Sequence, residues 1–339
     1  MTFPTLPYPL VVRQMLQFKA RLFAAEAAQV KEMAAAWLEI ETRLQGRMDA
    51  LALEIAGMIE RGETVKEWKI ARMERYRALL AQTQDQLAAY TDYAAGKISQ
   101  GQREWIQMGL FDANDAIRGY YTTYGKVAGA FDLLPVSAIE QMVGLAGDGS
   151  PLRALLVKSW PDSIDGLTNA LINAIAQGKN PRDTARAMRD GFGVGFDRAL
   201  RIARTEQLRV YREANRQQYQ ASGVVDGYKR LSARDDRVCA ACLFADDGTV
   251  YPLIYTFDAH TQCRCTSVPV VVGMPVVAWQ NGTSWFLAQN PVTQKNILGP
   301  GRFDAWNAGQ FELEDVIKRE FDEVWGGALV PKPLKDLVK

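Results

Sequence analysis

Apolar residues recur every three or four positions between residues 30 and 58, and this pattern restricts the fold more strongly than any other feature of the sequence. The spacing places them on one face of an α-helix, which has 3.6 residues per turn. A stripe of about four heptads is long enough for a coiled-coil-like seam, so we predict one long helix over residues 10–61. The stripe consists of Val30, Met33, Trp37, Ile40, Leu44, Met48, Leu51, Ile55 and Met58.

Arg61-Gly62 is expected to end this helix, because glycine ends helices readily. Two further helices are expected over residues 64–95 and 98–128. We predict that the chain from 10 to 95 folds back on itself as a hairpin and offers its remaining apolar face to an assembly partner. The region after residue 150 is expected to fold without residues 1–95.

The rest of the chain predicts a mainly α protein with a small α+β cysteine-rich module. Helices are expected over 164–176, from Pro181, over 196–222, over 284–290 and over 312–325, and strands over 224–231, 268–272 and from Val276. We therefore divide the chain into a helical N-terminal arm (1–128), a turn-rich hinge (129–151), a domain with the cysteines (152–275), and a C-terminal helical segment and tail (276–339).

Charge and hydropathy exclude several classes of protein. Lysine and arginine number 40 against 39 acidic residues, so the chain as a whole does not attract nucleic acid. No apolar run reaches the ~18 residues of a membrane span, and the N-terminus does not resemble a secretory signal. Four cysteines suit a reducing compartment. We expect a protein that is made in a cytoplasm.

All four cysteines and the only histidine lie between Cys239 and Cys265. Cys239 and Cys242 form a CxxC pair, which presents two sulfurs to one ion from a single turn. Cys263 and Cys265 follow about twenty residues later, with His260 just before them, and this is close to the spacing of a structural zinc site. We predict one bound Zn²⁺, which would stabilise a loop-rich segment with few large apolar residues.

The sequence leaves the fourth ligand open. Cys239, Cys242 and Cys263 are the first three, and the fourth is Cys265 or His260. Alternate side chains of a strand point the same way, which favours Cys265, while a His-x-x-Cys turn suits His260 equally well. Reduced core thiols and two disulfides are the alternatives to a metal. A redox CxxC lacks its flanking βαβ pattern here, and nothing marks the open position that a catalytic zinc needs.

Several short motifs follow one another along residues 165–272. They are Gln177-Gly-Lys-Asn-Pro181, Arg204-Thr205-Glu206, Tyr211-Arg-Glu-Ala-Asn215 with Tyr219, Ser222-Gly223-Val224, Lys229-Arg230-Leu231-Ser-Ala233, Asp236-Arg237-Val-Cys239 with Cys242, and His260-x-x-Cys263-Arg264-Cys265. In this order they resemble the phage head morphogenesis family typified by the F protein of phage Mu and the minor head protein of phage SPP1. Family members often have a proline after the histidine, where this chain has Thr261.

The resemblance implies a minor capsid protein of a tailed bacteriophage. Such a protein is assembled in the host cytoplasm with the portal protein and other head proteins, resides in the phage head, and in some phages influences DNA packaging or ejection. We do not expect an enzyme. The competing hypotheses are a virion-carried zinc-dependent enzyme acting in the host and a nucleic-acid-binding zinc module. The first requires polar residues around an open metal, and the second requires affinity that falls steeply with salt.

Arg204 and Glu206 lie two residues apart on a helix and therefore point to different faces. We expect both to be structural anchors that are hydrogen-bonded to the cysteine-bearing module, with catalysis or a partner contact as alternatives. Arginines are frequent between Arg182 and Arg216 and alternate with acidic residues. This pattern is typical of an ion-paired helical surface, and a DNA-facing patch is the alternative.

Overall fold

The computed structural model describes residues 8–129 and 131–338, which form two compact units. The helical unit comprises Glu26–Gln100 and Ser150–Arg204. The cysteine unit comprises the chain up to Ala25, Gly101–Gly149 and the chain from Thr205 onwards. Each unit thus combines stretches that are far apart in the sequence. The division that follows the chain, into 1–128, 129–151, 152–275 and 276–339, is a different partition and stays a prediction.

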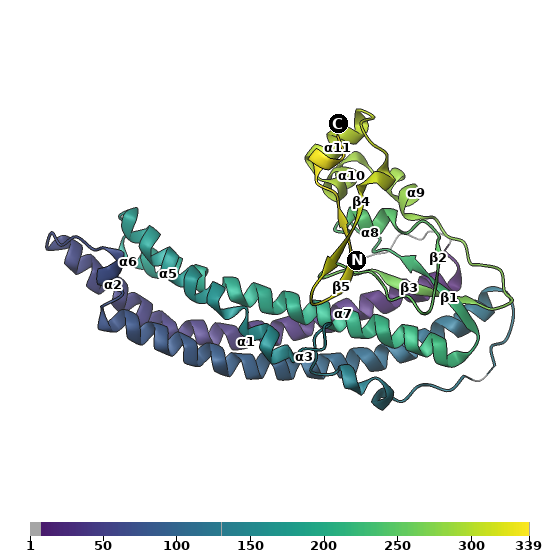
Figure 1. The fold of residues 1–339 in the computed structure, drawn as a ribbon, viewed down its shortest axis with the longest axis horizontal. Helices are drawn as coiled ribbons and strands as arrows, with labels where there is room; N and C mark the ends of the chain where they lie inside the picture. The colour runs from purple at the N-terminus through teal and green to yellow at the C-terminus, as the bar shows by residue number, and fades with distance from the viewer. Residues whose placement is uncertain (1–7, 130, 339) are drawn as a thin grey trace. The chain divides into compact units, whose positions relative to one another are not determined.

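Two long helices, α1 (Leu10–Glu60) and α3 (Glu74–Thr123), give the helical unit an antiparallel pair (Figure 1). The Tyr90 hydroxyl donates to the Met33 carbonyl (3.2 Å), and the Lys97 ammonium group contacts the Glu32 carboxylate (2.6 Å). From Met33 to Met58 the predicted stripe is buried along its length. The long N-terminal helical hairpin is therefore confirmed, and its seam is occupied by its own partner helix.

The turn of this hairpin was predicted correctly, but the helix after it was not. Gly62 has φ +76°, a conformation that favours glycine, and only the short helix α2 (Glu67–Ile70) intervenes before α3. The two helices expected over 64–95 and 98–128 are one continuous helix. An exposed glycine costs a helix only about 1 kcal/mol, and buried Ala94 and Ile98 carry the apolar register past Gly96.

Four further helices follow, of which the last continues into the cysteine unit. They are α4 (Leu152–Val157), α5 (Trp160–Ala176), α6 (Pro181–Phe192) and α7 (Val194–Ser222). In the helical unit, the Trp37 ring stacks on Phe192 and Phe196 at centroid distances of 4.6 and 5.2 Å. Asn180 caps α6 by accepting from the Asp183 N–H (2.9 Å), as the Asn-Pro pair predicts.

Gly166→Ala is expected to lower the free energy of unfolding by about 1–3 kcal/mol, because α5 and α6 touch there. A Cβ on Gly166 would lie 2.2 Å from the Gly191 carbonyl oxygen. Gly46→Ala on α1 is the matched control. A Cβ on residue 46 would meet nothing within 4 Å, so this substitution is expected to raise the free energy of unfolding by about 0.5–1 kcal/mol. Urea unfolding of both variants checks the prediction, which equal effects at the two positions would contradict.

The cysteine unit contains a three-stranded antiparallel sheet in the order β2-β1-β3. Its strands are β1 (Val225–Leu231), β2 (Val250–Pro252) and β3 (Thr266–Val271). The strands expected over 224–231 and 268–272 are present. The strand expected from Val276 does not form. The Val277 N–H donates to the Tyr120 hydroxyl (3.1 Å) rather than to a neighbouring strand.

The first turns of α1 complete the core of this sheet. Val11, Val12 and Met15 are fully buried, in one cluster with Leu231 and Val268. The expectation that the region after residue 150 folds without residues 1–95 stays a prediction, and this packing argues against it. Removing those residues would uncover the sheet.

The C-terminal part of the chain adds short helices and a hairpin. These elements are α8 (Ala240–Phe244), α9 (Gly282–Leu287), α10 (Pro291–Leu298), α11 (Pro300–Asn307), β4 (Ile317–Asp322) and β5 (Gly326–Pro331). Single 3₁₀ turns occur at Val136–Ala138, Glu140–Met142, Leu313–Val316 and Leu334–Asp336. The helix expected over 312–325 is wrong: only a 3₁₀ turn forms, and β4 then pairs with β5 across a turn over 323–325, after which Gly326 opens β5 with φ +76°.

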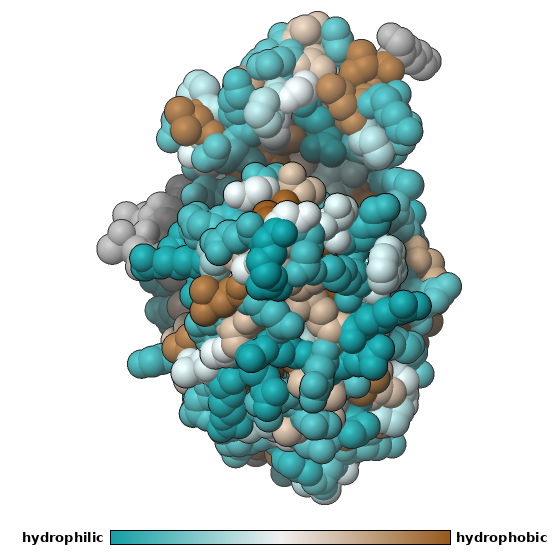
Figure 2. Space-filling view, turned by 90° about the vertical axis from the view of Figure 1, so that its left-hand side faces the viewer, coloured by the Kyte–Doolittle hydropathy of each residue, from teal (hydrophilic) through white to brown (hydrophobic). Residues whose placement is uncertain are grey.

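In the described part of the chain, no helix is long and apolar enough to cross a membrane. On the face drawn in Figure 2, hydrophilic residues predominate and hydrophobic residues occur singly or in small groups.

Candidate metal centre

The four thiols and His260 meet beside α8 in the cysteine unit. Cys239 is the N-cap residue of α8 and Cys242 lies within that helix. Cys263 and Cys265 end the loop that leads into β3. Gln262 adopts φ +60° there, and its N–H donates to the Thr205 hydroxyl on α7 (3.1 Å). This turn brings the second cysteine pair back to the first.

The candidate ligands form two overlapping groups around Cys242. The sulfurs of Cys242, Cys263 and Cys265 lie within 4.8 Å of one another, as do the ligand atoms of Cys239, Cys242 and His260. The sulfurs of Cys242 and Cys263 are 3.8 Å apart. Tetrahedral Zn²⁺ with Zn–S bonds of about 2.3 Å places its sulfurs about 3.8 Å apart, whereas a disulfide needs about 2.05 Å. All four thiols are free, and the cluster can hold a metal.

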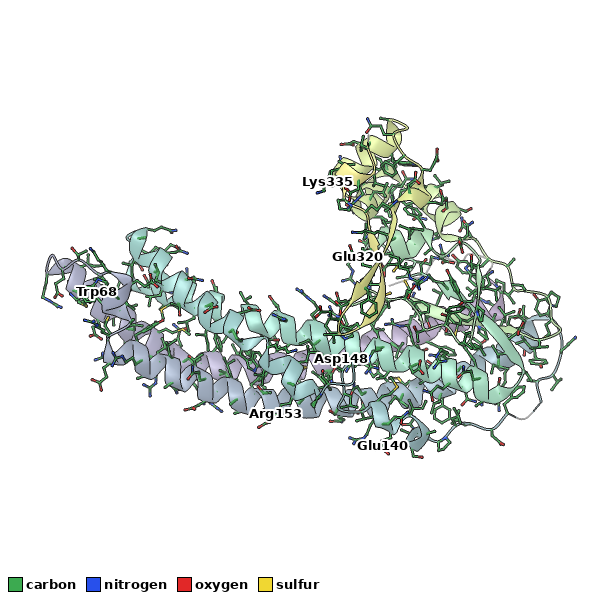
Figure 3. All side chains as sticks on the ribbon, in the orientation of Figure 1. Trp68, Glu140, Asp148, Arg153, Glu320 and Lys335 are labelled. Atoms are coloured by element: carbon green, nitrogen blue, oxygen red, sulfur yellow. The ribbon has the colours of Figure 1, made fainter. Side chains whose placement is uncertain are left out.

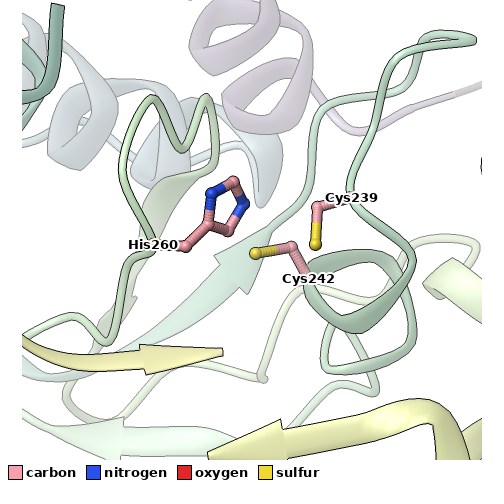
Figure 4. A group of neighbouring side chains, drawn as sticks. All are labelled: Cys239, Cys242 and His260. Atoms are coloured by element: carbon pink, nitrogen blue, oxygen red, sulfur yellow. The ribbon is translucent and has the colours of Figure 1, made fainter. Parts of the chain in front are cut away.

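The imidazole of His260 is directed toward Cys239 and Cys242 (Figure 4). Its Nδ1 lies 2.7 Å from the Thr261 carbonyl oxygen, which can only accept, so Nδ1–H is the donor. Burial is the largest single influence and lowers the pKa of His260, but the hydrogen bond and charge of Cys239, with smaller contributions from Thr261 and Cys265, together raise the pKa overall. His260 therefore either binds a metal through Nε2 or donates to Cys239 from outside the coordination sphere.

The thiols share their protons unequally. The pKa of Cys239 is lowered to about 5, chiefly by a hydrogen bond with Cys242. Burial opposes this shift, and the hydrogen bond and charge of His260 add to it. A hydrogen bond with Cys242 likewise lowers the pKa of Cys263, while Cys242, as the donor, has a pKa raised well above its ordinary value. Part of the cluster is therefore thiolate at neutral pH, which is the form that binds metals.

Two buried arginines approach this cluster, and the sequence assigned neither of them a role. Arg212 on α7 donates to the Cys263 carbonyl (2.9 Å), and Arg230 on β1 lies 4.0 Å from the Cys242 sulfur. Both guanidinium groups lie over the Phe257 ring, at 5.5 and 4.0 Å from its centroid. The burial of Arg212 could have been predicted from the sequence. Arg212 follows Leu208, which is buried, by four residues on α7 and therefore lies on the same apolar face of the helix.

Glu206 is fully buried and binds several donors at once. Its carboxylate accepts from Gln102 Nε2 (3.3 Å), the Gly147 N–H (3.1 Å), Arg209 Nε (2.9 Å) and Trp325 Nε1 (2.7 Å). The carboxylate thus joins α3, α7, the segment before α4 and the β4–β5 turn.

Arg204 is placed differently from Glu206. It forms an ion pair with Glu26 in the helical unit. The residue between them, Thr205, makes the contact with the cysteine-bearing loop. The anchoring role of Arg204 and Glu206 toward the cysteine module stays a prediction.

A cavity of about 440 Å³ lies beside α7 in the cysteine unit. Its lining includes Arg209, Arg216, Phe257 and Trp325. None of the described residues that line it is a cysteine or His260.

Six arginines between Arg182 and Arg216 pair with carboxylates. The pairs are Arg186–Asp183, Arg189–Asp190, Arg198–Asp162, Arg204–Glu26, Arg209–Glu206 and Arg216–Glu213. These arginines are therefore engaged within the protein, as the alternating charges suggested, and DNA contact by this stretch stays a hypothesis.

Residues 165–268 match the family of phage Mu protein F like proteins, a family of phage head morphogenesis proteins. The match runs from within α5 to within β3 and includes all five candidate ligands. The resemblance seen in the short motifs is confirmed. No curated protein and no solved structure matches the chain.

Proposed function

We propose that this chain, whose residues 165–268 form a phage Mu protein F like region, is a minor head protein that acts with the portal protein during assembly of a tailed phage head. The family match across α6, α7 and the cysteine cluster carries this proposal. The helical hairpin lies outside the match, which suits an arm that is specific to this chain's own partner. Purification of the chain together with the portal protein of the same phage tests the proposal, and absence of a complex would count against it.

The assembly surface proposed for the hairpin lies on α1. Leu38 and Leu53 are 60% and 63% exposed, and Ile59 is 48% exposed. At about 100° per residue these three side chains fall within about 120° of arc, with Leu53 opposite the buried seam and Ile59 at its edge. Trp68 in α2 is also exposed (Figure 3), and the Arg72 guanidinium group lies over its ring. Exposed apolar side chains on one helix face favour a protein partner.

Leu38→Glu with Leu53→Glu is expected to remove the protein from purified heads while leaving its thermal unfolding unchanged, because both side chains are exposed in the free chain. Arg43→Gln with Arg47→Gln is the matched control, since it changes the net charge equally at exposed positions of the same helix. The readout is protein content of purified particles. Normal incorporation of the double leucine variant would place the binding surface elsewhere.

We propose that the cysteine cluster holds one structural zinc ion. The buried sulfurs, their spacing and their thiolate character support this assignment. Bound there, the ion would clip α8 to the loop before β3. The module has little regular structure of its own, so such a clip would contribute much of its stability.

We further propose that the protein is not an enzyme. A catalytic zinc needs an open coordination position reached by substrate. Three of the thiols are buried, and the cavity beside α7 is lined by none of the candidate ligands.

A further inference from the structure

The cavity beside α7 has a row of arginines along one wall. Three arginines of this helix line the cavity, and their spacing of three and four residues places them on one helix face. They are Arg209, Arg212 and Arg216. The volume of about 440 Å³ lies within the range of pockets that hold small molecules.

Two of these arginines are neutralised by glutamates, and the third is not. The ion pairs are Arg209–Glu206 and Arg216–Glu213. Arg212 forms no ion pair with any residue that the structure describes, and within that part of the chain its one hydrogen bond runs from Nη1 to the carbonyl oxygen of Cys263 (2.9 Å). The three arginines and their two glutamates therefore leave this wall of the cavity with one net positive charge.

Arg212 is 8% exposed, so its guanidinium group has lost most of its contact with water. A carbonyl oxygen accepts a hydrogen bond from a buried cation but does not neutralise it, and an unbalanced buried charge is destabilising. A guanidinium group binds a carboxylate or a phosphate through two parallel hydrogen bonds. A carboxylate balances one positive charge, whereas a phosphate monoester, with about −1.5 to −2 charges at neutral pH, exceeds it. The charge of the cavity wall therefore favours a monocarboxylate.

The opposite part of the lining suits an aromatic or apolar group attached to that carboxylate. Tyr228, Phe257 and Trp325 all line the cavity. The Arg212 guanidinium group lies 5.5 Å from the centroid of the Phe257 ring, and the rings of Tyr228 and Phe257 stack at 6.0 Å. The indole N–H of Trp325 already donates to Glu206 (2.7 Å), so Trp325 offers a ring rather than a hydrogen-bond donor. A carboxylate bound by Arg212 would thus lie next to an aromatic surface.

We propose that this cavity is a binding site for a small monocarboxylate with an aromatic or apolar body, and that Arg212 binds the carboxylate. The carboxylate belongs either to a free organic acid or to the last residue of a polypeptide, because the two present the same group to the arginine. This site is separate from the head-assembly role and from the proposed zinc ion, and neither is needed to measure binding.

The first test measures the binding of small probes to the full-length protein by isothermal titration calorimetry. Phenylacetate represents a free acid, and N-acetyl-glycyl-phenylalanine represents a peptide with a free C-terminal carboxylate. At least one of them should bind at one site per chain, and the tighter of the two identifies the source of the carboxylate. Phenylacetamide, which has the same shape as phenylacetate but no charge, should bind at least about tenfold more weakly than phenylacetate.

Three results of this titration would overturn the proposal. They are the absence of saturable binding by either carboxylate at millimolar concentration, equal binding of phenylacetamide, and tighter binding of phenyl phosphate than of both carboxylates.

The second test assigns the carboxylate to Arg212. Arg212→Gln should weaken binding of the better carboxylate probe at least about tenfold, because the charged hydrogen bonds are lost. Arg230→Gln is the matched control, since it removes another buried guanidinium group beside the cysteine cluster, and Arg230 is not among the described residues that line the cavity. This control should bind the probe as the wild-type protein does. Equal losses for the two variants would refute the role of Arg212.

A third variant fills the cavity without changing any charge, and it decides the matter if Arg212→Gln does not fold. Thr256 lines the cavity at an exposed position, so Thr256→Trp should fold and should weaken probe binding at least about tenfold by occupying the space of the ligand. Thr249→Trp is the matched control, because Thr249 is also exposed but is not among the described lining residues. Probe binding that is unchanged in Thr256→Trp would place the ligand elsewhere and overturn the proposal.

Discussion

Cys242→Ala is expected to abolish zinc binding and to unfold the cysteine unit. Cys242 is the one thiol that belongs to both groups of candidate ligands, and it is fully buried. Zinc contributes on the order of 10 kcal/mol to small zinc modules, so the loss should exceed the about 2–5 kcal/mol of a large-to-small core substitution. Metal analysis and thermal unfolding of the variant give the result.

Chelator treatment of the wild-type protein is the control for this prediction. It should reproduce the unfolding of the variant, and added Zn²⁺ should reverse it. Wild-type protein that contains no metal and two intact disulfides by mass spectrometry would replace the zinc site by the oxidised alternative.

Glu206→Ala is expected to lower the free energy of unfolding by about 3–5 kcal/mol, because it leaves Arg209 as an unpaired, largely buried charge. The substitution also removes the acceptor of the Trp325 indole N–H and of the Gly147 N–H. Urea unfolding provides the measurement.

Glu213→Ala is the matched control for Glu206, since it breaks an ion pair with the same spacing on the same helix. The Glu213 side chain is 20% exposed, whereas that of Glu206 is fully buried and also accepts from Trp325 and Gly147, so a smaller loss of about 1 kcal/mol is expected. If Glu206→Ala unfolds like the wild-type protein but is absent from heads, Glu206 belongs to a binding site and its structural role is wrong.

The long helices were predictable because their signals are local. The stripe from Met33 to Met58 is regular enough to define α1, and Gly62 marks its end. The fusion of the two expected helices into α3 was missed, although buried Ala94 and Ile98 continue the apolar register past Gly96, which lies in the gap between them. Strand β4 was missed because Lys, Arg and Glu favour helices, and its pairing with β5 is a long-range effect.

The candidate metal centre was predictable as a set of residues but not as a charged environment. The spacing identified Cys239, Cys242, Cys263 and Cys265, which the fold brings together. Arg212 approaches them from α7, some fifty residues upstream of Cys263, and no sequence spacing relates the two. The same holds for Trp325 and Glu206, which a hydrogen bond joins across 119 positions.

The packing of α1 against the sheet has a consequence for synthesis on the ribosome. Val11, Val12 and Met15 leave the ribosome early, but their partners Leu231 and Val268 are made only after most of the chain. The apolar side chains of the first turns of α1 therefore remain exposed, or make transient contacts, until β3 has left the ribosome. A chain that stops short of β3 cannot complete this core, so premature termination products should be cleared by proteases before they reach an assembling head.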